Sequence, residues 1–87
     1  MKTAEEMRKI TDDVMEEKRK RRLANSKSFV AAIGEWIEEA AKSGRTNLTI
    51  MGGRLLDENV DPAYIYEELI KYGYRVTRQY GDIRIYW

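Results

Sequence analysis

The 87-residue chain contains no cysteine and no histidine. Without cysteine it can form neither disulfides nor thiolate metal sites, a composition typical of proteins that work in a reducing cytoplasm. Without cysteine and histidine it cannot assemble the usual catalytic triads, and it lacks the commonest general base. We therefore expect a protein that is not an enzyme and that uses no cofactor and no metal ion.

Long apolar runs and an excess of one charge are also missing. No segment approaches the roughly 20 apolar residues that cross a bilayer, and the first residues lack the apolar core of a signal peptide. We expect no membrane partner and a cytoplasmic location. Sixteen basic and fifteen acidic side chains give a net charge of +1, so only a local patch would attract a polyanion. A hydrophobic content of 43% with one proline predicts a folded domain rather than a disordered chain.

Residues 1–24 have the pattern of a charged helix. Thr3 and Glu6 are spaced as in a capping box, and Met7, Ile10 and Val14 recur at three- and four-residue intervals. The stripe then stops, because residues 16–22 are charged on every side and cannot belong to a core. We expect residues 1–24 to form an arm or an oligomerisation element, and residues 25–87 to form a compact body. Polar residues at 25–28 allow either a new helix start or one continuous helix, and the sequence leaves both open.

The body alternates helix and strand signals. A wide apolar face over residues 29–40 predicts the main core helix, ended by Gly44. Two-residue alternation over residues 47–51 predicts a strand. Residues 54–60 are expected to be a loop, with Leu55 and Leu56 packed against the body. Asp61 followed by Pro62 predicts the start of a second body helix, which Gly73 should close.

The last segment has the pattern of a β-hairpin. Residues 74–80 and 83–87 alternate in polarity, and Gly81-Asp82 between them suits a two-residue type II′ turn. This register places three cross-strand pairs on the inward face, namely Tyr80 with Ile83, Arg78 with Ile85, and Val76 with Trp87. The predicted fold is a small single α+β domain in the order α-α-β-α-β-β, with helices on one face of a three-stranded antiparallel sheet. The charged N-terminal helix should be partly separate from it.

The stretch Leu69-Ile70-Lys71-Tyr72-Gly73-Tyr74-Arg75-Val76, followed by a turn and Ile83-Arg84-Ile85-Tyr86-Trp87, resembles a C-terminal signature of small phage and prophage proteins. These proteins have a helix that ends in LxxxGYxV and a strand that ends in IxW. The resemblance implies a phage or prophage origin and action in the cytoplasm of a bacterial host. It carries over no catalytic residue. Phage proteins of this size bind host proteins, including defence nucleases, or sequester signalling nucleotides, so the resemblance implies a binding role.

Basic and aromatic side chains are the candidates for partner contact. Eight are singled out: Lys18, Arg19, Arg21, Arg22, Arg54, Arg75, Arg84 and Tyr86. Tyrosine and tryptophan are enriched where proteins bind one another, and this small core cannot hide all nine aromatic side chains. We predict a binding module that modulates a host macromolecule, such as an inhibitor of a defence nuclease.

Two alternatives remain open at this point. One is a nucleic-acid-binding protein that uses the basic run from Lys18 to Arg22. The other is an oligomeric sponge for a signalling nucleotide. Against the first, carboxylates at positions 16 and 17 are spaced to pair with Lys20 and Arg21 along a solvated helix.

Overall fold

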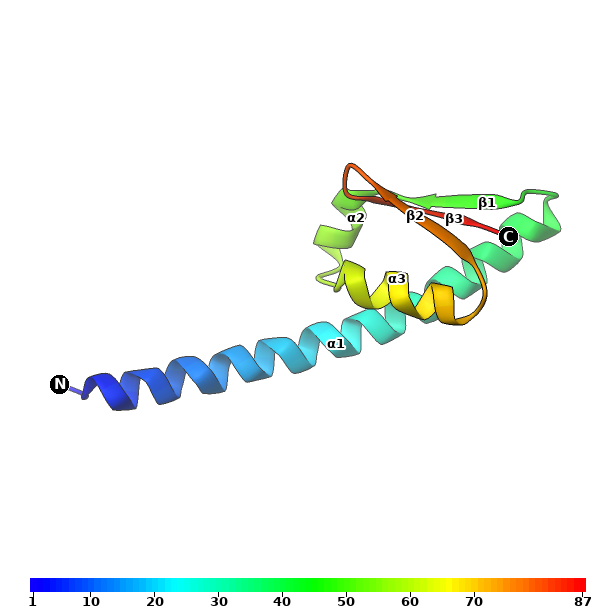
Figure 1. Ribbon diagram of the computed structural model, residues 1–87. Coiled ribbons are helices and arrows are strands. Elements are labelled where there is room, and N and C mark those ends of the chain that lie inside the picture. The colour runs from blue at the N-terminus through cyan, green and yellow to red at the C-terminus, as the bar shows by residue number, and fades with distance from the viewer.

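The computed structural model describes all 87 residues as six elements. They are the helices α1 (Ala4–Lys42), α2 (Gly52–Asp57) and α3 (Pro62–Lys71), and the strands β1 (Asn47–Ile50), β2 (Arg75–Gln79) and β3 (Asp82–Tyr86). The sheet is antiparallel in the order β1-β3-β2, and the C-terminal half of α1 and α3 cover one of its faces (Figure 1). The α+β class and the three-stranded antiparallel sheet are as predicted. None of the helices combines enough length with enough apolar character to cross a bilayer.

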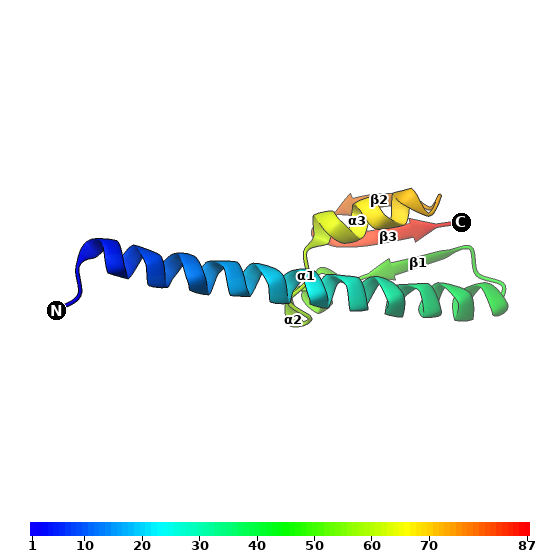
Figure 2. The ribbon, with the colours of Figure 1, turned by 90° about the horizontal axis from the view of Figure 1, so that it is seen from below.

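Helix α1 is one unbroken helix of 39 residues, which is the continuous alternative that the sequence left open. The order of elements therefore begins with one helix, not with the two of the predicted α-α-β-α-β-β order. The first part of α1 leaves the body as a single projecting rod (Figures 1 and 2). The molecule is therefore 63 Å long and only 23 and 21 Å across. Its radius of gyration is 17.1 Å, against roughly 12 Å for a compact domain of this length.

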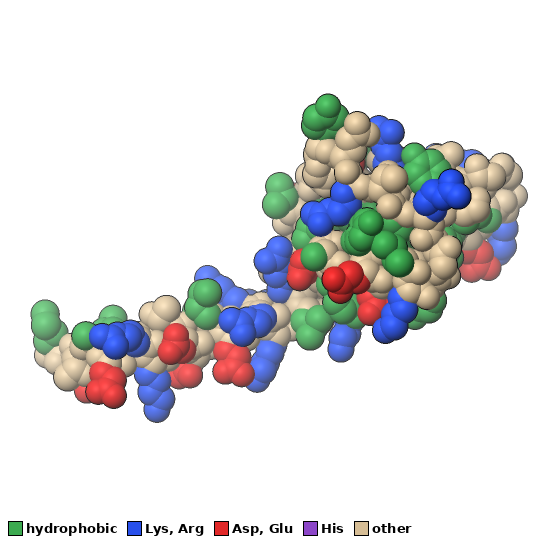
Figure 3. Space-filling model, in the orientation of Figure 1, with side chains coloured by type: hydrophobic (Ala, Val, Ile, Leu, Met, Phe, Trp, Pro, Cys, Tyr) green, Lys and Arg blue, Asp and Glu red, His purple; other side chains and the backbone are tan.

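Residues 1–24, which we call the arm, are all exposed. The Thr3 side chain caps the start of the helix by accepting the Glu6 N–H at 3.2 Å, as the capping pattern predicts. Figure 3 shows this rod with basic and acidic side chains along it and isolated apolar ones between them. The arm has no part in the core.

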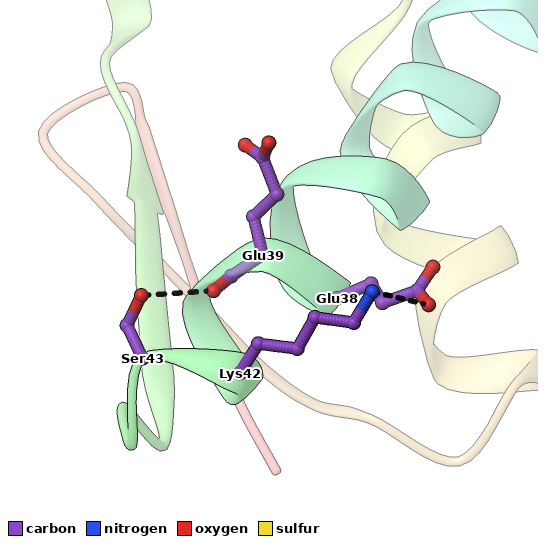
Figure 4. Close-up of polar contacts among 4 residues, drawn as sticks. All are labelled: Glu38, Glu39, Lys42 and Ser43. Atoms are coloured by element: carbon purple, nitrogen blue, oxygen red, sulfur yellow. Dashed lines mark hydrogen bonds and ion pairs between the residues drawn. The ribbon is translucent and has the colours of Figure 1, made fainter.

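The end of α1 is closed by local contacts (Figure 4). Ser43 Oγ donates to the Glu39 carbonyl at 3.1 Å, and Lys42 pairs with Glu38 at 3.4 Å. Gly44 then takes a φ of +84°, and the Arg45 N–H donates to the Ala40 carbonyl at 2.9 Å. This closure turns the chain back into β1, so that α1 and the sheet lie face to face.

The core lies between the sheet and the helices that cover it. Each element contributes apolar side chains that are at least nine-tenths buried. These residues are Phe29, Ile33, Ile37, Ile50, Leu55, Val60, Ile65, Leu69, Val76, Ile83 and Ile85. Of the six hairpin side chains that were predicted to face inward, Val76, Ile83 and Ile85 are buried in this core.

The hairpin turn lies one residue earlier than predicted. Gln79 pairs with Asp82, so Tyr80 and Gly81 form the turn, with φ values of +52° and +83°. Two positive φ values are typical of a type I′ turn, whose twist matches that of the strands. Val76 now lies opposite Ile85 rather than Trp87. A register shift of two residues keeps every side chain on its predicted face, but Tyr80 leaves the inward face and becomes 96% exposed.

The predicted loop before Asp61 contains the short helix α2. Gly52 begins it, and the Gly52 N–H donates to the Asp82 carboxylate at 2.7 Å. A Cβ atom built on Gly52 would lie 3.0 Å from the Gly81 carbonyl oxygen, whereas one on Gly53 meets nothing within 4 Å. The absence of a side chain at Gly52 therefore lets α2 pack directly against the hairpin turn.

Substitution of these adjacent glycines should have opposite effects. We expect Gly52→Ala to lower the free energy of unfolding by about 1–2 kcal/mol, because backbone atoms must move apart to admit the methyl group. Gly53→Ala should raise it by up to about 1 kcal/mol, because alanine is the better helix former. Urea unfolding followed by tryptophan fluorescence measures both. Equal effects of the two substitutions would contradict the close approach at Gly52.

Candidate functional site

The polar residues that were candidates for a helix break instead hold α1 against the loop before α3. The buried Ser26 hydroxyl donates to the Arg22 carbonyl and accepts the Asp61 N–H, both at 2.8 Å. Asn25 Nδ2 donates to the Asn59 carbonyl at 3.3 Å. Arg22 donates from Nε and Nη2 to the Val60 carbonyl, each at 3.3 Å. Apart from the bond between Ser26 and Arg22, these contacts join residues more than 30 positions apart in the sequence, and α1 continues past residue 25.

This junction forms one wall of an open hollow of about 430 Å³. We call it the turn hollow, because the hairpin turn forms its opposite wall. Its lining comes from α1, α2, the loop after α2, the first residue of α3, and the hairpin. The lining residues are Arg22, Gly52, Gly53, Leu55, Leu56, Asn59, Val60, Pro62, Arg78, Tyr80, Gly81 and Asp82. Its volume lies within the range of ligand and side-chain pockets, which is about 300–1,000 Å³.

Two arginines and one aspartate set the charge of the turn hollow. Asp82 already accepts the Gly52 N–H, and none of the three forms an ion pair. Arg22 binds Val60 through two of its nitrogens, although a guanidinium has five N–H donors. Arg78 lies on the same face of β2 as buried Val76, yet it is exposed at the end of the strand. Both arginines therefore keep donors for a carboxylate or carbonyl of a partner.

The rim of the turn hollow is apolar and exposed. Leu56 is 83% exposed and Tyr80 is 96% exposed. Tyr80 holds this position with a positive φ, a conformation that is uncommon for a bulky residue and that favours glycine or asparagine. Backbone strain of this kind is concentrated at functional sites.

The eight predicted partner residues lie in separate places, and only Arg22 lines the turn hollow. Lys18, Arg19 and Arg21 are exposed on the arm. Arg54 stacks on Trp36 with its guanidinium carbon 4.2 Å from the ring centroid, so it ties α2 to α1. The last three lie on strands β2 and β3, on the face of the sheet away from the helices: Arg75, Arg84 and Tyr86.

Sequence reasoning missed all the lining residues of the turn hollow except Arg22, among them Leu56, Arg78 and Tyr80. Tyr80 and Arg78 were expected to face inward on a longer strand, and Leu56 was expected to pack against the body. The surplus of aromatic residues was the one sequence signal that some tyrosine must be exposed, and it did not indicate which. No group of three or more aspartates and glutamates is arranged to hold a metal ion.

In comparisons with known proteins, no protein-family model, curated protein or solved structure matches this chain.

Proposed function

We propose that this protein is a binding module that holds a protein partner at the turn hollow. One observation carries the proposal: Tyr80, almost fully exposed in a strained backbone conformation, stands at the rim of a pocket lined by two arginines. Tyrosine and arginine are the residue types that most often dominate binding energy at protein interfaces. A fold selected for stability alone would place asparagine or glycine at this turn position.

The partner that fits this chemistry is a protein segment with an apolar side chain and a carboxylate. The apolar group would enter between Leu56 and Tyr80, and the carboxylate would meet the free N–H donors of Arg22 and Arg78. The likeness of the C-terminal segment to phage proteins supports a partner from a bacterial host cell. A defence nuclease that is inhibited by occlusion is the partner class we propose on that ground.

Binding of nucleic acid by the arm is less well supported. Lys18, Arg19 and Arg21 have no carboxylate within ion-pair distance, which leaves them free for phosphates. However, six carboxylates lie on the preceding 17 residues of the same rod. A nucleic acid lying along the arm would meet these carboxylates within a Debye length, which is about 8 Å at physiological salt.

The substitution Tyr80→Asn separates function from stability. We expect it to weaken partner capture at least tenfold, the loss typical of an interface residue worth more than about 1.4 kcal/mol. The same change should raise the free energy of unfolding by about 0.5–1 kcal/mol, because asparagine tolerates a positive φ better than tyrosine does. Quantitative pulldown from bacterial lysate and urea unfolding give the two readouts.

Tyr72→Asn is the matched control, since Tyr72 is another exposed tyrosine, at 71%, at the far end of α3. It should leave capture unchanged. Leu56→Ser tests the other side of the rim and should weaken capture of the same protein. The proposal fails if the captured protein survives both rim substitutions, or if the control substitution releases it equally.

A further inference from the structure

The arm carries an apolar stripe that the body cannot cover. Met7, Ile10 and Val14 are 51%, 41% and 46% exposed. Helix α1 runs without a break from Ala4 to Lys42, so the arm cannot fold back onto its own sheet. Helices in proteins owe most of their stability to the packing of an apolar face, and all residues of the arm are exposed. A partner that covers the stripe would stabilise the arm.

The apolar stripe of the arm and the buried side of α1 lie at different angles around the helix axis. At 3.6 residues per turn each residue advances about 100° around the helix. On this basis the stripe points about a third of a turn away from the side that carries Ile33 and Ile37. Toward the body the same line continues through Lys18 and Arg21. One face of the arm is thus apolar near its free end and basic near the body.

The charges of the arm divide in the same way. Residues 1–17, the tip, carry three basic and six acidic side chains, a formal charge of −3. Residues 18–24, the root, carry five basic and no acidic side chains, a formal charge of +5. Only one ion pair within the arm, between Lys20 and Glu16 at 3.6 Å, uses any of these charges. If two arms packed side by side in parallel, the acidic tips would lie together and so would the basic roots. If they packed antiparallel, the acidic tip of each arm would lie against the basic root of the other.

We infer that the stripe is covered by the arm of a second copy of this chain, packed antiparallel about a two-fold axis. Full overlap of residues 4–24 sets the register. Val14 then lies opposite Val14 of the second copy, Ile10 opposite Lys18, and Met7 opposite Arg21. The aliphatic stems of the lysine and arginine cover the apolar side chains, and their charged ends reach the acidic tip. This inference does not depend on the turn hollow.

The first test is the mass of the full chain by sedimentation or light scattering. Measurement from about 1 μM to 1 mM spans the dissociation constants of weak protein pairs. We expect the mass to rise from 10.3 kDa toward twice that value, and the dissociation constant to increase several-fold when salt rises from about 0.05 to 0.5 M. A chain that stays monomeric throughout would overturn the inference, and the stripe would then belong to another protein.

Two double variants test whether the apolar stripe of the arm is the surface that pairs. Ile10→Gln with Val14→Gln removes the stripe without loss of helix propensity or charge, and it should leave a monomer. Lys9→Gln with Asp12→Gln alters the opposite side, also without a change in net charge, and should keep the dimer. Circular dichroism of both at low concentration checks that the body is intact. A stripe variant that dimerises as well as the control would contradict the inference.

Introduced cysteines test whether the paired arms are antiparallel. Because the natural sequence has no cysteine, only the introduced thiols can form disulfides. A mixture of Met7→Cys and Arg21→Cys chains should form the mixed disulfide in preference to either symmetric one. A majority of symmetric disulfides would indicate parallel arms and overturn the antiparallel arrangement.

Discussion

Replacement of Ile33 by alanine is expected to lower the free energy of unfolding by about 4 kcal/mol, within the usual 2–5 kcal/mol for a buried isoleucine. Ile33 is completely buried where α1 meets the sheet and α3. The lost methyl and methylene groups would leave a cavity that this small body can close only in part. Since domains of this size have about 5–15 kcal/mol of total stability, the variant should be close to unfolding.

Ile10→Ala is the matched control, because it makes the same chemical change in the same helix. Ile10 is 41% exposed on the arm, so its replacement should change the stability of the body by less than about 0.5 kcal/mol. Chemical unfolding followed by fluorescence of Trp36 compares the two variants below the concentration at which arms pair. A difference of less than about 1 kcal/mol between them would contradict the assignment of body and arm.

Replacement of Ser26 by alanine is expected to have the second largest effect, a loss of about 2 kcal/mol. The Ser26 hydroxyl is fully buried and is the acceptor for the Asp61 N–H. Alanine would leave that N–H without a partner, which costs about 1–3 kcal/mol. The higher helix propensity of alanine would offset only a few tenths of a kcal/mol of this cost. Because the same hydroxyl positions the loop at Val60, the change should also loosen Arg22 at the turn hollow.

Ser28→Ala serves as the comparison for Ser26→Ala, since Ser28 is exposed two residues further along α1. It should be neutral or slightly stabilising, as alanine is the better helix former. Amide hydrogen exchange adds a local readout, in which the Asp61 amide should exchange faster in Ser26→Ala alone. Unchanged protection of that amide would show that the hydroxyl is not its essential partner.

Features governed by neighbouring residues were predictable from the sequence. The caps at Thr3 and Asp61 and the glycine closures at Gly44 and Gly73 lie where their local patterns place them. The buried faces of the strands also followed from polarity alternation. Each of these depends on atoms within a few positions of one another, and sequence patterns report such contacts directly.

Features governed by distant residues were not predictable. Asn25 and Ser26 have the chemistry of a helix start, but their partners are supplied by residues 59 and 61, so α1 continues. The glycine at 81 suggested a type II′ turn, yet the turn includes Tyr80, which has no local reason to take a positive φ. The turn hollow is assembled from three helices, a loop and the hairpin, and none of these alone carries its signature.

The central claim is that a partner is held at the turn hollow, and hydrogen exchange of the complex tests it most directly. Comparison of the free protein with the protein bound to its captured partner gives amide protection along the chain. We predict slower exchange at residues 52–60 and 78–82, with no change at residues 4–18 or on the outer face of β3. Protection confined to the arm or to the outer sheet face, with residues 78–82 unaffected, would contradict the account.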